Sequence, residues 1–114
     1  MNKLQKICFD IDGVICKTKK NNYKESKPYK KSIDFINKLF DKGHTVIIFT
    51  ARYMGRNNEK IHLAKKQGFQ MTKKQLKNWN VKYHKLIFGK PSFDLIIDDK
   101  SYDFKKDWIK KINI

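Results

Sequence analysis

The sequence predicts an α/β protein, specifically a three-layer α/β/α sandwich built on a mainly parallel sheet. Short apolar runs rich in β-branched residues alternate along the chain with segments whose apolar residues recur at helical spacing. Strands that alternate with helices are typical of a parallel sheet covered by helices. With 114 residues, the chain is expected to form one domain, residues 1–114, because single cores of roughly 100 to 150 residues are the commonest.

The first half of the chain predicts two strands joined by a crossover helix. Ile7 to Ile11 is a β-branched run that Asp12-Gly13 closes, which indicates a buried strand. The polar residues Lys17 to Lys27 are expected to form a loop or small flap. Pro28 to Gly43 has a helix-starting proline, apolar residues at helical spacing and a terminating glycine. His44 to Thr50 is continuously apolar in its middle, as expected of a strand covered on both faces.

The second half begins with an ambiguous segment. Residues 51–68 indicate a polar loop followed by a short helix, and Thr72 with Gln75 forms a capping-box pattern that predicts the start of another helix. The remaining apolar patterns predict, in chain order, strands at Lys85 to Phe88 and Asp94 to Asp98 and a closing helix over Phe104 to Ile112.

The composition limits the kinds of partner and the cellular setting that the protein can have. The formal net charge of +16 comes from lysines scattered through every segment, with arginine only at positions 52 and 56. This pattern indicates a solvated surface that attracts anionic substrates, with a dedicated nucleic-acid site as the alternative. No stretch approaches the roughly 20 apolar residues of a membrane span, and the start of the chain does not resemble a signal peptide. Cys8 and Cys16 form no metal-binding pattern, so we expect a reduced, cytoplasmic setting.

Polar side chains follow all four expected strands. In open α/β sheets, ligands bind beyond the carboxyl ends of the strands, so these side chains should meet at one edge. Two carboxylates ~4 Å apart repel by about 4 kcal/mol at an effective dielectric near 20, so a cation is expected among them. A cluster of oxygen donors suits Mg²⁺, which also neutralises phosphoryl groups. The residues at these ends are Asp10 and Asp12, then Thr50, Ala51 and Arg52, then Lys90, and finally Asp98 and Asp99.

Each of these residues also has a simpler structural interpretation. An Asp-Gly pair is commonly a turn, Thr50 could cap a helix, Lys90 could be a surface lysine, and Asp98-Asp99 could cap the last helix. Arg52 is placed either to touch an anionic substrate or to form a structural ion pair. Taken together, however, the four strand ends predict phosphoryl transfer, with the Thr50 hydroxyl and the Lys90 ammonium on the phosphoryl group and the carboxylates on the metal.

Four short motifs give the chain a family resemblance. The segment "FDIDGVI" resembles the first motif of the haloacid dehalogenase-like (HAD) phosphohydrolases, and "IIFTAR", "GKP" and "IIDDK" resemble the second, third and fourth in the family's order. The resemblance spans residues 7–100 and extends to a small, capless subgroup associated with capsular polysaccharide biosynthesis. It implies a Rossmann-like, HAD-like sheet without a cap domain.

The resemblance also implies a role for each residue. Asp10 would be the nucleophile that becomes an aspartyl-phosphate, and Asp12 would protonate the leaving oxygen and then activate water. Thr50, Ala51, Arg52 and Lys90 would bind the phosphoryl group. Mg²⁺ would be held by Asp10, by Asp12 through its carbonyl, and by Asp98 and Asp99 directly or through water. Because no cap fits, the open site would be completed by Arg52, by the loop from Tyr53 to Gln70, or by a neighbouring subunit of a homo-oligomer.

The function expected from the sequence is therefore a Mg²⁺-dependent phosphatase for a small phosphomonoester, such as a sugar or polyol phosphate of surface-polysaccharide synthesis. A phosphatase for nucleic-acid ends is the alternative enzyme, because the site is open and the surface is basic. A signalling receiver domain also combines acidic residues, Thr and Lys on a parallel sheet. Receivers place their acidic pair first along the chain, whereas here the acidic pair Asp98-Asp99 follows the last expected strand, which disfavours this alternative. A degenerate binding module is disfavoured, since every catalytic position keeps a competent residue type.

Overall fold

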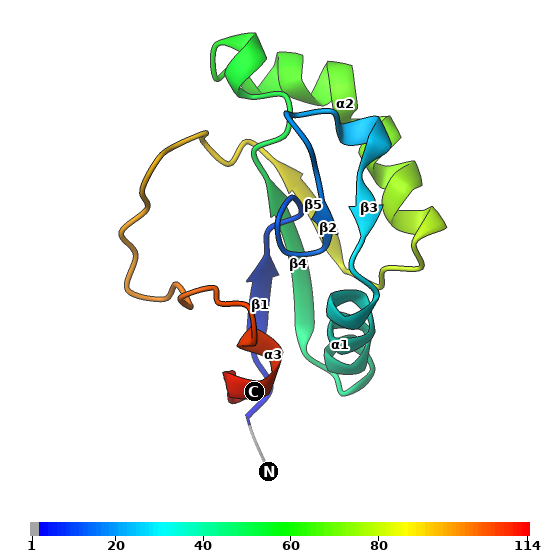
Figure 1. Cartoon of the computed structure of the whole chain (residues 1–114), viewed down its shortest axis with the longest axis vertical. Coiled ribbons are helices and arrows are strands. Elements are labelled where there is room, and N and C mark those ends of the chain that lie inside the picture. Colours follow the sequence, from blue (N-terminus) through cyan, green and yellow to red (C-terminus); the bar gives the residue numbers. More distant parts are fainter. Residues whose placement is uncertain (1–2) are drawn as a thin grey trace.

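The structure is a computed structural model that describes residues 3–114 and has an α/β fold. Its main sheet contains three parallel strands in the order β1-β4-β5 (Figure 1). They are β1 (Lys6–Phe9), β4 (Thr45–Thr50) and β5 (Lys85–Phe88), close to three of the strands predicted from the sequence. A second, two-stranded antiparallel sheet pairs β2 (Cys16–Lys17) with β3 (Lys27–Pro28), so the polar segment between them forms a small flap.

Two helices cover one face of the main sheet. α1 (Lys30–Asp41) and α2 (Ile61–Asn78) contribute Ile36 and Leu76 to the same hydrophobic cluster as Val46 and Ile48 of β4. All four side chains are buried. α3 (Trp108–Lys111) joins the same cluster through Trp108. The alternation along β4, in which only every second residue is fully buried, follows from the strand period of two.

Both long helices end where the sequence places a residue suited to a left-handed conformation. After α1, Gly43 has a φ of +100°, and the His44 N–H donates to the Leu39 carbonyl at 3.1 Å. This is the arrangement in which a left-handed residue lets the chain satisfy the last carbonyls of a helix. Asn80 does the same after α2 with a φ of 60°. The predicted end of the first helix at Gly43 is therefore confirmed.

The predicted start of a helix at Thr72 is wrong. α2 runs without a break from Ile61 to Asn78, so Thr72 lies in its middle and is fully buried. The capping-box pattern of Thr72 and Gln75 has another cause. Residues three apart lie on the same face of a helix, and both of these side chains accept hydrogen bonds from Arg52.

The strand predicted at Asp94 to Asp98 does not form. The chain turns at Gly89, where φ is +110°, and residues 89–107 contain no helix or strand and run outside the sheet (Figure 1). Leu95 is 77% exposed and Ile97 is 91% exposed, so the apolar pattern here does not reflect burial. A strand is stable only when a neighbour satisfies its backbone, and this segment has no such neighbour among residues 3–114. The predicted closing helix is likewise limited to Trp108–Lys111.

The second face of the sheet has no helical cover among the described residues. Cys8 of β1 and Ile87 of β5 are exposed on it, and Ile47 and Phe49 of β4 are half-buried. The three-layer arrangement expected from the sequence is therefore not confirmed, whereas the α/β class and the parallel sheet are. No helix within residues 3–114 combines the length and the apolar character needed to cross a lipid bilayer.

Candidate functional site

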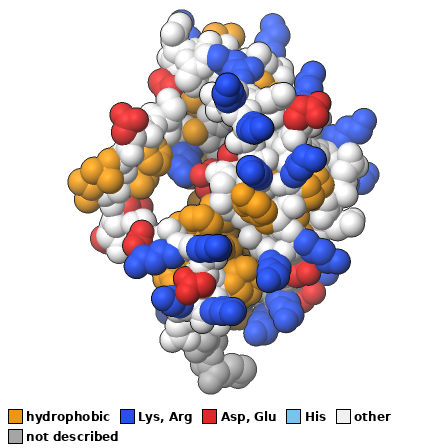
Figure 2. Space-filling view, viewed as in Figure 1, with side chains coloured by type: hydrophobic (Ala, Val, Ile, Leu, Met, Phe, Trp, Pro, Cys, Tyr) orange, Lys and Arg blue, Asp and Glu red, His pale blue; other side chains and the backbone are white. Residues whose placement is uncertain are grey.

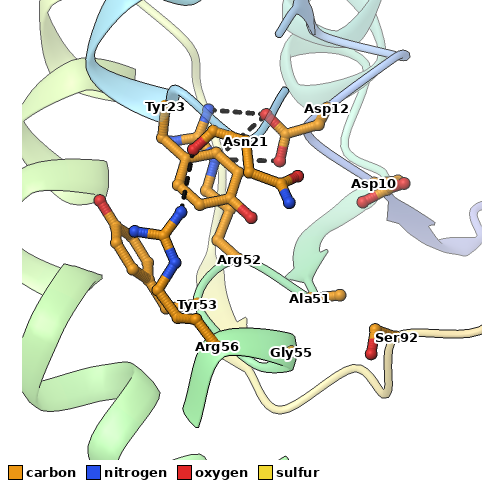
Figure 3. A pocket seen from close by; sticks show the side chains of 10 residues that line it. All are labelled: Asp10, Asp12, Asn21, Tyr23, Ala51, Arg52, Tyr53, Gly55, Arg56 and Ser92. Carbon is orange, nitrogen blue, oxygen red and sulfur yellow. Dashed lines mark hydrogen bonds and ion pairs between the residues drawn. The ribbon is translucent and has the colours of Figure 1, made fainter. Parts of the chain in front are cut away.

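A pocket of about 240 Å³ opens beyond the carboxyl ends of β1 and β4 (Figure 3). Strand ends converge there because the strands are parallel, as expected for ligand sites of open α/β sheets. One wall comes from the turn after β1, a second from the segment after β4 and a third from the flap between β2 and β3. The lining residues are Asp10, Asp12, Asn21, Tyr23, Ala51, Arg52, Tyr53, Gly55, Arg56 and Ser92.

Asp10 and Lys90 form an ion pair beside this pocket. The Lys90 Nζ lies 3.4 Å from Asp10 Oδ2, although the two residues are 80 positions apart in the sequence. The other carboxylate oxygen, Oδ1, accepts the N–H of Ile11 at 2.9 Å. Burial raises the pKa of Asp10 above its ordinary value, and Lys90 and the Ile11 N–H offset only part of that rise. Lys90 thus favours the ionised form of Asp10, but desolvation has the larger effect on the pKa of Asp10.

Asp12 is bound by Arg52 rather than free in the pocket. The Arg52 Nη2 lies 2.9 Å from Asp12 Oδ1, and Nε lies 3.0 Å from Oδ2, so the two groups meet side by side. The Thr18 hydroxyl also donates to Oδ1. The Asp12 side chain keeps 27% of its surface exposed toward the pocket, whereas that of Arg52 is fully buried. The structural ion pair considered for Arg52 from the sequence is thus present.

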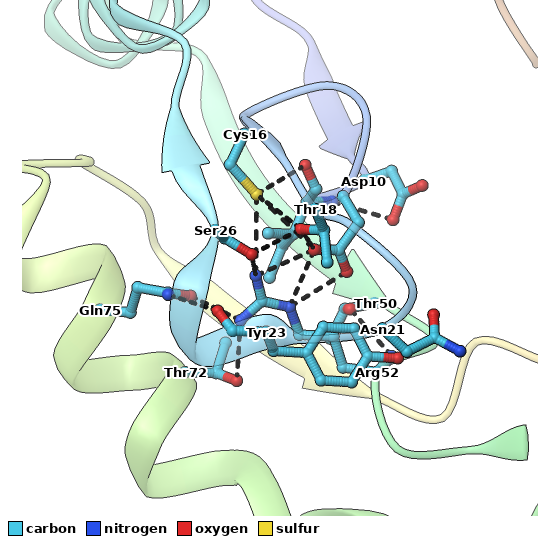
Figure 4. Close-up of polar contacts among 12 residues, drawn as sticks. Asp10, Cys16, Thr18, Asn21, Tyr23, Ser26, Thr50, Arg52, Thr72 and Gln75 are labelled. Atoms are coloured by element: carbon cyan, nitrogen blue, oxygen red, sulfur yellow. Dashed lines mark hydrogen bonds and ion pairs between the residues drawn. The ribbon is translucent and has the colours of Figure 1, made fainter. Parts of the chain in front are cut away.

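The buried guanidinium of Arg52 is held from every side (Figure 4). Its Nη1 donates to Gln75 Oε1 at 2.6 Å and to Thr72 Oγ1 at 3.3 Å, both on α2. The ring of Tyr23 lies across it, with 4.9 Å between Cζ and the ring centroid. Gln75 in turn donates from Nε2 to the Tyr23 carbonyl at 2.8 Å. Arg52 therefore ties the strand end, α2 and the flap into one unit and fixes the position of Asp12.

Thr50 and Ala51 lie where the sequence placed them, at the end of β4. Ala51 lines the pocket. Thr50 is fully buried, and its Oγ1 accepts the backbone N–H of Arg52 at 3.1 Å. The Lys90 N–H donates to the Thr50 carbonyl at 3.2 Å, which links the ends of β4 and β5. Asp10, Asp12, Thr50, Ala51, Arg52 and Lys90 thus gather at one edge of the sheet.

Asp98 and Asp99 do not join this group. Both lie in the exposed segment after β5, where Asp98 Oδ1 accepts the N–H of Lys100 at 3.1 Å and its pKa is lowered chiefly by that hydrogen bond. Within residues 3–114, no three His, Cys, Asp or Glu side chains are close enough together to hold a metal ion. A protein site for Mg²⁺ usually supplies at least one or two carboxylates with free oxygens. The Asp10 carboxylate fits that role, and Arg52 engages the Asp12 side chain but not the Asp12 carbonyl that the sequence predicts as a ligand. Asp98 and Asp99 lie apart from these two residues, so the full predicted ligand set is not brought together. The magnesium site stays a prediction.

Several pocket residues were not predicted individually. Asn21 and Tyr23 come from the flap, and Tyr53 and Arg56 come from the segment after β4. The sequence showed these two segments only as polar stretches that follow predicted strands, without indicating which of their residues would line a pocket. Arg56 lies over the rings of Tyr53 and Tyr23. Its contact with Tyr23, 33 positions away, has no local signal in the sequence, because it depends on how the flap folds over the strand ends. Ser92 reaches the pocket because its N–H and hydroxyl both donate to Glu59.

Comparison with known proteins bears on the fold alone. No family model matches the chain, and no curated protein is recognisably similar to it in sequence. The fold resembles the crystal structure of a structural-genomics target from Vibrio cholerae, with a TM-score of 0.85 and 20% sequence identity. The alignment covers 97% of this chain and 91% of that one. Nearly the whole arrangement of elements therefore recurs in another protein of different sequence.

Proposed function

We propose that the protein is a phosphohydrolase of the HAD type that acts on a small phosphomonoester, with Asp10 as its nucleophile. The observation that carries the proposal is the contact of 3.4 Å between Lys90 Nζ and Asp10 Oδ2 at the carboxyl edge of a parallel sheet. A carboxylate next to an ammonium group beside a pocket suits attack on an anionic phosphoryl group, since the cation offsets the charge that both reactants carry. The order of the four motifs in the sequence supports the same family.

The proposed reaction has two displacements. In the first, an oxygen of Asp10 bonds to phosphorus, the ester P–O bond breaks, and the leaving alkoxide takes a proton. In the second, water bonds to phosphorus, the bond between Asp10 and phosphorus breaks, and inorganic phosphate leaves. Asp12 would supply the first proton and accept the proton of water. Arg52, which pairs with both oxygens of Asp12, would stabilise the carboxylate that Asp12 becomes after it has given up the first proton.

Mg²⁺ dependence stays part of the proposal as an expectation from the sequence. When bound, Mg²⁺ would neutralise phosphoryl oxygens. Asp98 and Asp99 lie in the exposed segment, so neither displacement depends on them. The finer fold, a three-layer HAD-like core without a cap, belongs to the same proposal. So does a cytoplasmic setting, in which the free thiols of Cys8 and Cys16 stay reduced.

A small metabolite is favoured over a nucleic-acid end as the substrate. On the face shown in Figure 2, lysine and arginine side chains are spread over the surface and do not form one continuous stripe. A nucleic-acid groove would instead follow the backbone with adjacent basic groups. The pocket of about 240 Å³ is below the roughly 300 to 1,000 Å³ of drug-sized sites, which suits a metabolite. We propose a sugar or polyol phosphate, as in surface-polysaccharide synthesis, by family resemblance.

The test is phosphate release from a panel of sugar phosphates, polyol phosphates and a 5′-phosphorylated oligonucleotide, each with Mg²⁺ and with EDTA. We expect turnover of at least one small phosphomonoester and loss of about 10³-fold or more in kcat for Asp10→Asn, as for other removed nucleophiles. Lys90→Met should also lower kcat. Oligonucleotides as the only substrates would favour the nucleic-acid alternative.

A matched control replaces a carboxylate elsewhere. Asp34 is exposed on α1, and Asp34→Asn should leave turnover unchanged. Phosphate release that survives Asp10→Asn, or no release from any member of the panel under either condition, would contradict the proposal.

A further inference from the structure

The pocket contains two guanidinium groups in contrasting situations. Arg52 is buried and paired with Asp12. Arg56, in the short 3-10 turn Gly55–Asn57, is exposed at the pocket and, among residues 3–114, no carboxylate lies within ion-pair distance of it. Since Lys90 already pairs with Asp10, Arg56 is the cation of this pocket that lacks an anionic partner in the described part of the chain.

Arg56 is nevertheless held in a defined position. Its Cζ lies 4.8 Å from the centroid of the Tyr53 ring and 5.4 Å from that of Tyr23. Its Nη2 donates to the Asn21 carbonyl at 3.0 Å. An exposed arginine usually samples many rotamers, and contacts of this kind reduce the entropy lost when it binds a ligand. Within residues 3–114, four of its five N–H groups make no hydrogen bond and remain available for an anion.

The two tyrosines beneath Arg56 are themselves fixed. Their ring centroids are 4.8 Å apart, and both side chains are buried. Tyr53 has a φ of 66°, a conformation that is costly for a bulky residue and that is found more often at functional sites than elsewhere. Its ring packs directly over Gly68 of α2, where even a Cβ atom would collide with it. The fold therefore maintains a strained backbone that places the ring under Arg56.

Arg56 lies across the pocket from Asp10 (Figure 3). From this arrangement we infer a second anionic subsite: the Tyr23, Tyr53 and Arg56 wall binds a carboxylate group on the substrate portion that remains after the phosphoryl group is removed. The inference rests on the proposed function, because it takes the Asp10 side of the pocket as the phosphoryl end. The substrate class is then a phosphomonoester with a second negative charge, such as a phosphorylated sugar acid.

Binding of matched probe pairs tests this subsite. 6-Phosphogluconate and sorbitol 6-phosphate differ only by a carboxylate in place of a hydroxymethyl group, and 3-phosphoglycerate and glycerol 3-phosphate form a shorter pair with the same difference. Calorimetry is done on the Asp10→Asn protein, so that no probe is consumed. We expect one carboxylate probe to bind about tenfold more tightly than its partner, since hydrogen bonds to charged groups have this order of strength.

Arg56→Gln in the same background should reduce that preference to about onefold. The matched control is Lys66→Gln, which removes one charge from an exposed position on α2 outside the pocket. The Lys66→Gln protein should still bind the carboxylate probe more tightly than its partner. If the hydrogen bond from Arg56 to the Asn21 carbonyl were purely structural, Arg56→Gln would change the melting temperature without changing the ratio of the affinities for the two probes of a pair.

If neither carboxylate probe binds more tightly than its partner to the protein that retains Arg56, the subsite is overturned. This outcome does not depend on whether the Arg56 and Lys66 variants fold. A preference that persists in Arg56→Gln, or one that Lys66→Gln removes equally, would also overturn the subsite. Because these are binding measurements, they remain separate from the phosphatase assay. Missing phosphate release would overturn the proposed function and leave a measured Arg56-dependent preference intact.

Discussion

Arg52 lies against Asp12 and contacts both of its carboxylate oxygens, with Nη2 2.9 Å from Oδ1 and Nε 3.0 Å from Oδ2. The guanidinium is fully buried, whereas the carboxylate is partly open to the pocket. A fork of donors facing a carboxylate fixes the plane of that carboxylate as well as its position. Asp12, which we expect to transfer protons in the reaction, is thus oriented by the guanidinium of Arg52, which solvent does not reach.

Removing this guanidinium should destabilise the protein. Arg52→Met leaves Asp12, Thr72 and Gln75 without their partner, and breaking a buried pair typically costs about 3 to 5 kcal/mol. We expect a loss near the lower end, about 3 kcal/mol, because Asp12 keeps contact with solvent. Arg52→Lys should lose less, since the charge remains but the fork does not. Urea unfolding measures both.

The control for this prediction is the exposed pair of Lys82 and Asp41. Their charged atoms are 2.8 Å apart, but both side chains are about half exposed. Solvent screens such pairs, so Lys82→Met should cost less than about 1 kcal/mol. Equal losses for Arg52→Met and Lys82→Met would contradict the buried role of Arg52.

Asp10→Asn should stabilise the metal-free protein at neutral pH. Burial raises the pKa of Asp10 above its ordinary value of 3.8, so the folded protein binds the proton more tightly than the unfolded chain. Wild-type stability should therefore fall as pH rises from the unfolded value through the raised folded value, and the deficit persists above it. Asparagine does not ionise and avoids this loss.

Unfolding free energies of wild type and Asp10→Asn, measured in EDTA from acidic to neutral pH, would show the difference. We expect the two curves to converge at the acidic end and to separate above it, with Asp10→Asn the more stable. A difference that is constant with pH, or one of opposite sign, would show that burial does not dominate at Asp10.

Gly68→Ala should destabilise the protein and disturb the pocket. The added Cβ would collide with the ring of Tyr53, which cannot move freely because it is buried against Tyr23. Overpacking of this kind costs roughly 1 to 3 kcal/mol, which over most of that range exceeds the gain of about 1 kcal/mol from replacing a glycine inside a helix. Thermal or urea unfolding would measure the net loss.

Gly55→Ala is the matched control, because among the described residues a Cβ there would meet only the Ser92 Oγ, at an ordinary distance of 3.8 Å. It should leave stability within about 0.5 kcal/mol of wild type, as for other accommodating surface positions. If Gly68→Ala proved as well tolerated, the tight packing of Tyr53 on α2 would be refuted.

Ile97→Lys should have little effect on stability. Ile97 is 91% exposed in the segment after β5, so its replacement removes no buried apolar surface and should change the free energy of unfolding by less than about 0.5 kcal/mol. Ile36→Ala, at a fully buried position of α1, should cost about 2 to 5 kcal/mol. A large loss for Ile97→Lys would show that this segment pairs as the strand expected from the sequence.

Local pattern predicted much of the framework. The apolar runs near positions 7, 47 and 87 formed the three parallel strands, because each has another strand to pair with. Gly43 ended the first helix, because its left-handed conformation is set by the residue itself. The pattern failed for Asp94 to Asp98, because apolar residues favour a strand only when another strand is there to pair with. It failed at Thr72 because the side chain that bonds to it, Arg52, is 20 residues away.

The sequence by itself determined that polar groups follow the strands, and parallel pairing then brought Asp10, Asp12, Thr50, Ala51, Arg52 and Lys90 to one edge. Only the tertiary structure decided which of these groups pair: Asp10 with Lys90, Asp12 with Arg52, and Arg56 with two aromatic rings and no carboxylate among the described residues. The physical reason is that strand ends are set by local hydrophobic periodicity, whereas ion pairs across 40 or 80 residues depend on distances of a few ångströms that exist only after the flap, α2 and the sheet have packed.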